Sequence, residues 1–316
     1  MMKRRTFLLS MPVMGASAEG AAQDRTTLIY EGVSPNKLCC DTMIREMPDG
    51  SWVMVMLGGG DREPDRANDM FLSRSVDEGK SWSKLERISV GVKERDANRS
   101  LVPTELVVYR GECRLYFTNH AGRFDDWTTW CVKSKDSCRS WGGPEPVPAL
   151  LHHSTFVRNS FVRRNGELVI AWQHYLGANG PVDPRNGILV SKDHGRTFQL
   201  FGDIRISEDD SYRGFAENTV VELPGDHMVM LIRADRLGGV LFRSDSVDGG
   251  RTWSKAAPTD IPNPGSKATL YSLGGERVAL LHNPNPKERN PLSLWVSFDG
   301  MKSWPYRRTL VAESVD

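Results

Sequence analysis

One eight-residue pattern, S-x-D-x-G-x-T/S-W, recurs along almost the whole chain. Its clearest copy is SVDGGRTW at residues 246–253, and the others are SVDEGKSW at 75–82, SKDSCRSW at 134–141, SKDHGRTF at 191–198 and SFDGMKSW at 297–304. Successive aspartates in these copies are 59, 57, 55 and 51 residues apart. A near-constant period of this length is typical of chains that are built from repeated blades or solenoid units.

Each copy is predicted to form the turn between two antiparallel strands. In the copy at 246–253, the apolar run GVLF at 239–242 leads into the turn. Asp248 can accept hydrogen bonds from the N–H groups and hydroxyls of the turn, a glycine can take a positive φ, and the aromatic ring can pack beneath. The five aspartates are therefore expected to be structural, because turn-forming aspartate is far commoner than catalytic aspartate.

The repeat resembles the Asp box of sialidases and their relatives, and the resemblance covers nearly the whole chain. It implies an all-β fold, a six-bladed β-propeller of sialidase type, over residues 24–316. Five blades are evident, and their first strands are expected to start near Cys40, Val102, Arg158, Glu217 and Ser266. Because the chain stops at Asp316, where a sixth blade should open, that blade is expected to be truncated.

Apolar runs predict the other inner strands. The second strands of the five blades are expected at 52–57, 114–117, 168–172, 228–232 and 278–281, because strands buried between blades should be apolar throughout. The short run TTLIY at 26–30 precedes the first repeat. In propellers that resemble this one, such a strand often closes the ring by joining the last blade.

Composition narrows the range of partners. A net charge of +1 with 26% charged residues gives no broad basic field, so nucleic acid is not an expected partner. No run of eighteen apolar residues offers a membrane-spanning helix. The five cysteines include no C-x-x-C pair of the metal-binding kind, so no metal, cofactor or disulfide framework is expected.

Residues 1–23 have the features of an export signal. The sequence KRRTFLL at 3–9 is followed by a modest apolar stretch and by the small residues GASA at 15–18. This pattern is similar to a bacterial twin-arginine signal peptide with cleavage after Ala18. The protein is therefore expected in the periplasm or outside the cell, and the alternative is a merely basic N-terminus.

Polar residues at the entrances of first strands should face a common pocket on the propeller axis. Glu217 and Arg233 match a sialidase pattern in which a Glu opens a blade and polarises a nucleophilic tyrosine, while the Arg binds the substrate carboxylate. Arg289, after the Asn-Pro turn at 283–284, resembles the third arginine of that family. Arginine suits this role because its fork stays charged and binds a carboxylate through two hydrogen bonds. The alternatives are a structural Glu–Arg pair and a solvated loop charge at Arg289.

The first blade departs from the family pattern. Sialidases open this blade with Arg-Ile-Pro, and Cys40 fills the slot of that arginine here, which weakens the expectation of sialic acid itself. The loop GGGDREPDR at 58–66 stands where the family has its acid/base aspartate, and Asp65 fits the spacing best, with Asp61 second. A carboxyl partly buried by substrate can have its pKa raised into the general-acid range. The alternatives are an acidic surface run and a cation site.

The nucleophilic tyrosine of the family has no match, because its blade would open after the last residue of this chain. Tyr212 is a weaker loop candidate for that role.

Further polar residues mark blade 3, where Arg158, Asn159 and His153 lie at the entrance and His174 lies near the end of the second strand. Related propellers use such positions to bind sugar hydroxyls, and some use His as a base or acid. Histidines that only pack or face solvent are the alternative.

Together these features predict an exported exo-glycoside hydrolase of sialidase type that releases a terminal anionic sugar from a glycan or oligosaccharide. The working mechanism has Asp65 as acid/base, Arg233 and Arg289 on the carboxylate, and Glu217 beside a tyrosine not found in the sequence. Two alternatives on the same fold stay open. One is a lyase or other glycosidase that acts on uronate-containing glycans, and the other is a propeller that binds glycans without turnover.

Overall fold

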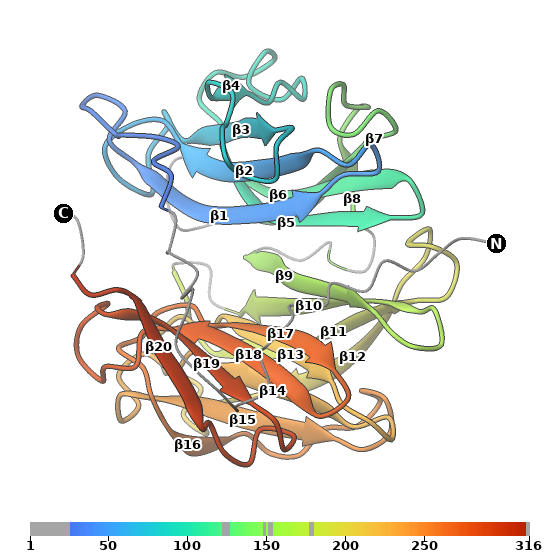
Figure 1. Cartoon of the computed structure of the whole chain (residues 1–316), viewed down its shortest axis with the longest axis vertical. Helices are drawn as coiled ribbons and strands as arrows, with labels where there is room; N and C mark the ends of the chain where they lie inside the picture. Colours follow the sequence, from blue (N-terminus) through green and yellow to red (C-terminus); the bar gives the residue numbers. More distant parts are fainter. Residues whose placement is uncertain (1–25, 122–126, 148–149, 151–153, 177–179, 314–316) are drawn as a thin grey trace, which may run out of the picture.

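The computed structural model describes residues 26–121, 127–147, 150, 154–176 and 180–313 (Figure 1). Within these residues all regular elements are β-strands, which form five antiparallel four-stranded sheets. Each sheet is one blade, with its four strands side by side in chain order. Blades 1 and 2 lie at the top of Figure 1, blades 4 and 5 at the bottom, and blade 3 between them. The described residues thus form an all-β propeller with five blades.

The first and second strands of all five blades lie where the sequence predicts them. Blade 1 contains β1 (Cys39–Glu46), β2 (Trp52–Gly58), β3 (Asp69–Ser75) and β4 (Glu86–Arg87), and blade 2 contains β5 (Ser100–Tyr109), β6 (Glu112–His120), β7 (Thr128–Ser134) and β8 (Glu145–Pro146). Blade 3 contains β9 (Thr155–Val162), β10 (Leu168–Tyr175), β11 (Pro184–Ser191) and β12 (Gln199–Ile204). Blade 4 contains β13 (Asn218–Glu222), β14 (Met228–Ile232), β15 (Val240–Ser246) and β16 (Ala257–Pro262). Blade 5 contains β17 (Thr269–Gly274), β18 (Arg277–His282), β19 (Leu292–Ser297) and β20 (Tyr306–Val311).

Apolar side chains of the inner strands pack each blade against the next. In β10, Ile170 packs into the core between blades 2 and 3, whereas its neighbour Val169 packs into the core between blades 3 and 4. Successive residues of a strand point to opposite faces of the sheet. A strand buried on both faces therefore needs an apolar residue at every position, which explains why the second strands carry no polar alternation.

Polar side chains join the first strands of neighbouring blades around the axis. The Glu105 carboxylate of β5 accepts a hydrogen bond from the Asn159 N–H of β9 at 2.7 Å, and an ion pair joins β5 to β1. Asn159 Oδ1 accepts a hydrogen bond from the Val220 N–H of β13 at 2.7 Å. Thr219 Oγ1 then accepts one from the Leu270 N–H of β17 at 2.9 Å. These bonds fix the five first strands as the inner layer of the propeller.

The five repeat turns share one geometry. Asp248 Oδ1 accepts a hydrogen bond from the Thr252 N–H at 2.9 Å, and Oδ2 accepts one from the Thr252 hydroxyl at 2.6 Å. The same two bonds form at Asp77, Asp136, Asp193 and Asp299. Where the glycine is missing, Cys138 and Met301 adopt its left-handed backbone, with φ of 65° and 67°. Each turn connects the third strand of a blade to the fourth, so the predicted structural role of these aspartates is confirmed.

The strand expected at residues 26–30 is not found, and this prediction was wrong. Residues 26–38 contain only an isolated bridge between Val33 and Asn36. The segment is held by the loop after β2 instead, because Asp61 accepts hydrogen bonds from the Ser34 hydroxyl at 2.6 Å and the Lys37 N–H at 3.0 Å. Blades 1 and 5 share no sheet in the described part of the chain. A sixth blade is not among these residues and stays a prediction, and the predicted export signal lies outside them.

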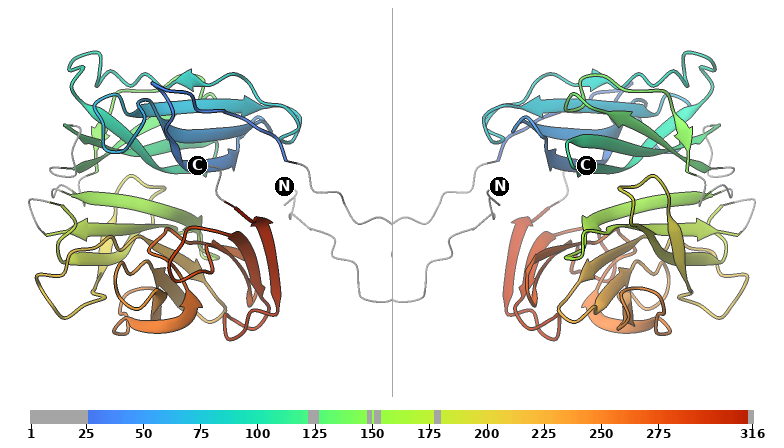
Figure 2. Two further views of the ribbon diagram at one scale, coloured as in Figure 1. Left: turned by 90° about the vertical axis from the view of Figure 1, so that its left-hand side faces the viewer. Right: turned by 90° about the vertical axis from the view of Figure 1, so that its right-hand side faces the viewer.

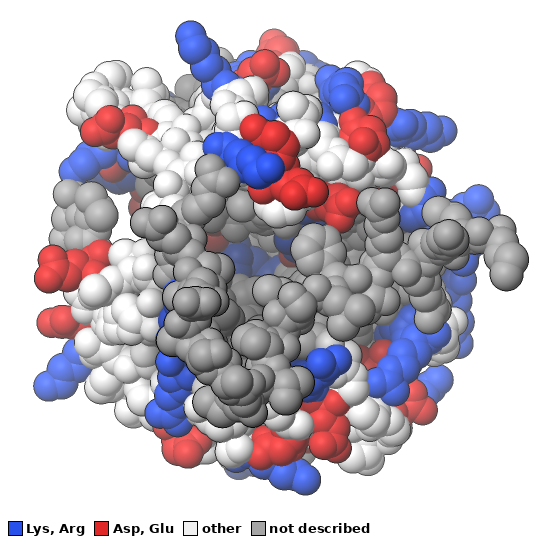
Figure 3. Space-filling model, in the orientation of Figure 1, with Lys and Arg blue, Asp and Glu red and all other residues white. Residues whose placement is uncertain are grey.

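In the side views of Figure 2 the sheets of blades 1 and 2 lie above those of blades 3 to 5. Charged side chains of both signs lie on the face drawn in Figure 3, where they are interspersed, in keeping with the net charge of +1. In the part of the chain that the structure describes, no helix is long and apolar enough to cross a membrane.

Asp248→Ala is expected to lower the melting temperature by a few degrees at pH 7, because the turn loses its hydrogen-bond acceptor. The hydrogen bonds from Thr252 and Ser246 lower the pKa of Asp248 to about 2. This stabilisation is therefore present above the unfolded-state pKa of about 4 and is lost as the pH falls through about 2. Thermal melts at pH 7 and pH 2 check this, with Asp260→Ala on exposed β16 as the control. Equal melting temperatures of the two variants at pH 7 would contradict it.

Candidate active site

Arg158 of β9 is the centre of a charged cluster at the axis. Its side chain is 6% exposed, its Nη1 donates a hydrogen bond to Asp41 Oδ1 at 2.6 Å, and its Nη2 lies 3.3 Å from Glu217 Oε1. Asp41 belongs to blade 1 and Glu217 to blade 4, so one guanidinium connects three blades. Burial alone would lower the pKa of Arg158, but the two carboxylates outweigh it and raise that pKa above its ordinary value.

The predicted pairing of Glu217 with Arg233 is present in the cluster. Arg233 follows β14, and its Nη1 donates to Glu217 Oε2 at 2.8 Å. Its Nε and Nη2 bind the two carboxylate oxygens of Asp235 at 2.6 and 2.9 Å. Burial alone would raise the pKa of Glu217, but Arg158 and Arg233 outweigh it and lower that pKa. Glu217 is therefore ionised, and all three nitrogens of the Arg233 guanidinium bind carboxylates of the protein.

Asp41 brings a further carboxylate to Arg158 from β1. Its φ of 50° lies in the left-handed region, and the register between β1 and β2 shifts between Cys40 and Met43. Such bulges re-aim side chains, and strained backbone of this kind is frequent at functional sites. Lys267 Nζ, just before β17, lies 3.9 Å from Asp41 Oδ1. Burial alone would raise the pKa of Asp41, but Arg158 and Lys267 outweigh it and hold that pKa below its ordinary value.

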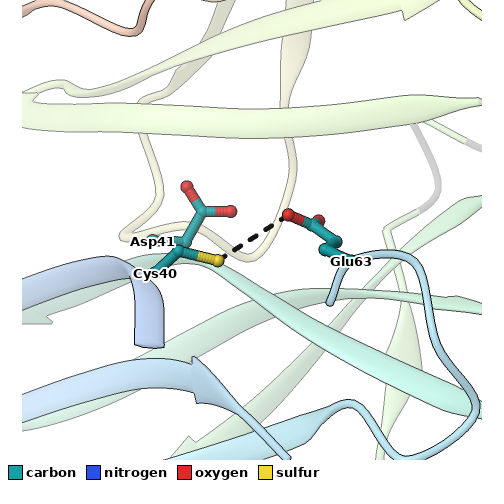
Figure 4. A group of neighbouring side chains, drawn as sticks. All are labelled: Cys40, Asp41 and Glu63. Atoms are coloured by element: carbon teal, nitrogen blue, oxygen red, sulfur yellow. Dashed lines mark hydrogen bonds between the residues drawn. The ribbon is translucent and has the colours of Figure 1, made fainter. Parts of the chain in front are cut away.

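Glu63, on the loop between β2 and β3, faces Asp41 (Figure 4). One oxygen of each carboxyl group and Cys40 Sγ all lie within 4.8 Å of one another. Burial and the negative charge of Asp41 raise the pKa of Glu63 to about 7, against the lowering effect of Arg158. Two neighbouring carboxyl groups therefore differ in protonation near neutral pH, because Asp41 is ionised while Glu63 is about half protonated.

Cys40, Asp41 and Glu63 are close enough together for their metal-binding ability to need a test. Two features oppose a metal. Arg158 and Lys267 already supply positive charge beside Asp41. Burial also raises the pKa of the Cys40 thiol above its ordinary value, whereas a cysteine binds metal as the thiolate. The three residues therefore fit a proton-transfer site better than a metal centre.

The two aspartates predicted as acid/base residues lie on the same loop as Glu63 and have local partners. Asp61 is exposed and binds the N-terminal segment. Asp65 Oδ1 accepts a hydrogen bond from the Ala67 N–H at 2.9 Å, and Arg62 lies 3.6 Å from its Oδ2. The structure thus gives both aspartates a part in the loop conformation, and it brings Glu63 to Asp41.

Arg289 lies at the border of the cluster. Its side chain is exposed, and its Nη2 donates a hydrogen bond to the Gly265 carbonyl at 3.1 Å. Gly265 packs closely on Asp235, because a Cβ at this position would lie only 2.5 Å from Asp235 Oδ1. The loop that carries Arg289 therefore adjoins the Arg233–Asp235 pair, while Arg233 itself lies inside the cluster.

The remaining polar residues predicted for sugar binding have mixed positions. Arg158 is the centre of the cluster, as described above. The Asn159 side chain is used in the bond to Val220 that joins blades 3 and 4. His174 Nδ1, in β10, lies 3.2 Å from Thr155 Oγ1. His153 lies outside the described residues.

The tyrosines near the cluster are poor nucleophiles at neutral pH. The Tyr212 hydroxyl donates a hydrogen bond to the Asp235 carbonyl at 2.5 Å, and burial and the Asp235 charge raise its pKa to about 12. Burial and the charge of Glu217 raise the pKa of Tyr175 above its ordinary value. A phenol attacks as the phenolate, so raised pKa values oppose this role.

Sequence reasoning missed four members of the cluster, namely Asp41, Glu63, Asp235 and Lys267. Two of them could have been found from the sequence. Asp41 directly follows Cys40, where the sequence departs from the sialidase pattern, and Glu63 lies in the acidic loop at 58–66. Spacing identifies such a loop. Spacing alone does not show which carboxylate of the loop points toward the axial cluster, because that direction depends on the backbone angles of each residue.

Residues 51–315 match the family model of the BNR repeat-like domain, so the chain belongs to that family. A sialidase from Bacteroides fragilis (strain YCH46) is 24% identical to it over 280 residues, which cover 78% of this chain and 49% of that protein. The chain thus spans about half the length of this curated relative.

Solved structures of sialidases have a similar fold. The Hadza microbial sialidase Hz136 matches with a TM-score of 0.70 and 19% identity, over 86% of this chain and 58% of that one. The NanB sialidase from Streptococcus pneumoniae matches with a TM-score of 0.69 and 14% identity, over 90% of this chain and 63% of that one. A protein of unknown function from Dyadobacter fermentans DSM 18053 has a TM-score of 0.68 at 17% identity, over 87% and 83%. At these identities the likeness shows the fold, a β-propeller of sialidase type.

Proposed function

We propose that this protein is a glycoside hydrolase with a sialidase-type fold, whose chemistry takes place at the axial cluster, between Asp41 and Glu63. The observation that carries the proposal is the pair of carboxyl groups with oxygens within 4.8 Å of each other. Their surroundings keep Asp41 ionised and leave Glu63 partly protonated near neutral pH. Most glycosidases cleave the glycosidic bond with such a pair of carboxyl groups, whereas sialidases use a tyrosine as nucleophile. Membership of the BNR repeat-like family and similarity to sialidases support the same reaction class.

The mechanism assigns one role to each carboxyl group. Asp41 attacks the anomeric carbon while the bond from that carbon to the leaving oxygen breaks, and Glu63 gives its proton to that oxygen. In the second step Glu63 takes a proton from water, the resulting hydroxide oxygen bonds to the anomeric carbon, and Asp41 is released. The short distance between the carboxyl groups fits this retaining course, because inverting enzymes leave room for a water between theirs. Arg158, 2.6 Å from Asp41, keeps the attacking carboxylate ionised and oriented.

Three finer parts of the sequence-based prediction remain parts of this proposal. They are release of a terminal sugar, export through residues 1–23, and a further blade that closes the ring. The outer face of blade 5 supports the last of these. Tyr271 is 70% exposed and Leu281 is 37% exposed, while their strand neighbours Leu270 and Leu280 are buried against blade 4. A further blade would cover these exposed apolar residues.

The charge of the sugar is a separate question. The sequence predicts an anionic sugar, with Arg233 and Arg289 on its carboxylate. That prediction requires arginines whose guanidinium groups can bind a ligand carboxylate. The guanidinium of Arg233 already binds Glu217 and Asp235.

Glu63→Gln is expected to lower kcat/KM by about 10²–10⁴, because the amide cannot donate the proton that the leaving oxygen needs. Hydrolysis of a panel of aryl glycosides and a fluorogenic sialoside measures this. Asp65→Asn is the matched control on the same loop, and under this proposal it is expected to keep most of the activity, because the Asp65 carboxylate bonds within the loop. Loss of activity in Asp65→Asn with little change in Glu63→Gln would contradict the assignment. A pure protein that binds glycans and hydrolyses none would contradict the enzymatic proposal itself.

The pH profile provides a second test of Glu63. Burial, Asp41 and Glu217 raise its pKa, and Arg158 and Cys40 lower it, with a net value of about 7. A general acid works in its protonated form, so kcat/KM should fall as the pH rises through about 7. Phenyl glycosides are suitable substrates, because their leaving group needs protonation more than nitrophenolate does. A rate that stays constant from pH 6 to pH 9 would be inconsistent with this role.

A further inference from the structure

The arginines of the axial cluster already face carboxylates of the protein. Arg158 binds Asp41 through Nη1 and lies beside Glu217 through Nη2, while its Nε is buried away from solvent. Arg233 uses Nη1 for Glu217 and its other two nitrogens for Asp235. Neither fork is therefore available in this arrangement for two-point binding of a carboxylate that arrives with a ligand.

Asp41 is the carboxylate on which the cations converge. The charges of Arg158, Lys267 and Arg233 all lower its pKa. The left-handed backbone at Asp41 and the register shift beside it turn this carboxylate toward the blade 3 arginine. The chain thus supplies a carboxylate of its own at the point where positive charge gathers.

The charge balance of the cluster disfavours a second carboxylate. Three cations of the cluster face three acidic side chains besides the half-protonated Glu63, so the cluster is close to neutral or slightly negative: Arg158, Arg233 and Lys267 against Asp41, Glu217 and Asp235. A ligand carboxylate would bring an uncompensated charge next to Asp41 and Glu63 in a partly desolvated site. A neutral sugar carries no such penalty, because its hydroxyls can donate hydrogen bonds to carboxylates.

We propose that Asp41 takes the place of the carboxylate of a sugar acid, so that the axial cluster accepts a neutral sugar and rejects sialate and uronate residues. The inference rests on the proposed function for placing the sugar beside Glu63. It differs from the sequence-based expectation of an anionic sugar. Its physical basis is repulsion of the wrong ligand by a built-in charge, which is a common source of specificity.

Removing the Asp41 carboxylate should turn the axial cluster into a site that binds sugar acids. In Asp41→Ala, Arg158 Nη1 and Lys267 lose their carboxylate, while Glu217 still compensates part of the Arg158 charge. Asp41→Asn removes the charge but keeps the size of the side chain, so it controls for rearrangement of the site in Asp41→Ala. The probes are N-acetylneuraminate and glucuronate, with glucose as the neutral counterpart of glucuronate. Isothermal titration calorimetry at pH 7.5 on the full chain measures their affinities.

The unaltered protein should bind neither acid measurably at about 10 mM, and the Asp41 variants should bind at least one acid about tenfold or more tightly. Adding Lys267→Met to Asp41→Ala should reduce that gain, and glucose should show none. Tight binding of either acid by the unaltered protein would overturn the inference. So would folded Asp41 variants without any gain, or an equal gain for glucose. Because binding is the readout, a protein without hydrolytic activity could still support this inference while contradicting the proposed function.

Discussion

A buried guanidinium needs negative charge around it, and this requirement at Arg158 organises the axis of the propeller. A charge removed from water is costly unless ionised partners compensate it. Arg158 finds Asp41 on one side and Glu217 on the other, from blades that are distant in sequence. Glu217 also forms an ion pair with Arg233, and Arg233 forms one with Asp235. The electrostatic requirement of one side chain thus links three blades and helps to keep Asp41 and Glu217 ionised.

Much of the fold could be predicted because its signals are local. The box around Asp248 contains, within eight residues, the partners of the hydrogen bonds that the Asp248 carboxylate accepts in its turn. The apolar run of β10 indicates burial on both faces. Glu217 and Arg233 were also predictable as a pair, since they lie on adjacent strands of one blade. Asp41 and Glu63 were not, because their meeting depends on a left-handed residue in β1 and on the path of the loop after β2. The run at 26–30 was misleading for a similar reason, since Asp61 fixes the following segment on that loop.

In each blade the outer turn has a structural role, whereas the residues that could take part in chemistry lie at the inner strands. At the outer turns the five copies repeat the same hydrogen bonds, even where Cys138 or Met301 replaces glycine. At the inner strands the copies differ, with an acidic residue in β1, a basic one in β9 and an acidic one before β13. A regular repeat therefore holds an irregular set of charges, and function must be argued from that set because a fold alone does not specify chemistry.

The protonation of Glu63 is the most direct test of this account. Its carboxyl carbon can be followed by ¹³C NMR across a pH titration, with Glu63→Gln to assign the signal. The account predicts titration near pH 7, and a clear fall of that pKa in Asp41→Asn, because the Asp41 charge helps to raise it. Titration of Glu63 near the ordinary value of 4.5, or a pKa that does not respond to Asp41→Asn, would contradict it.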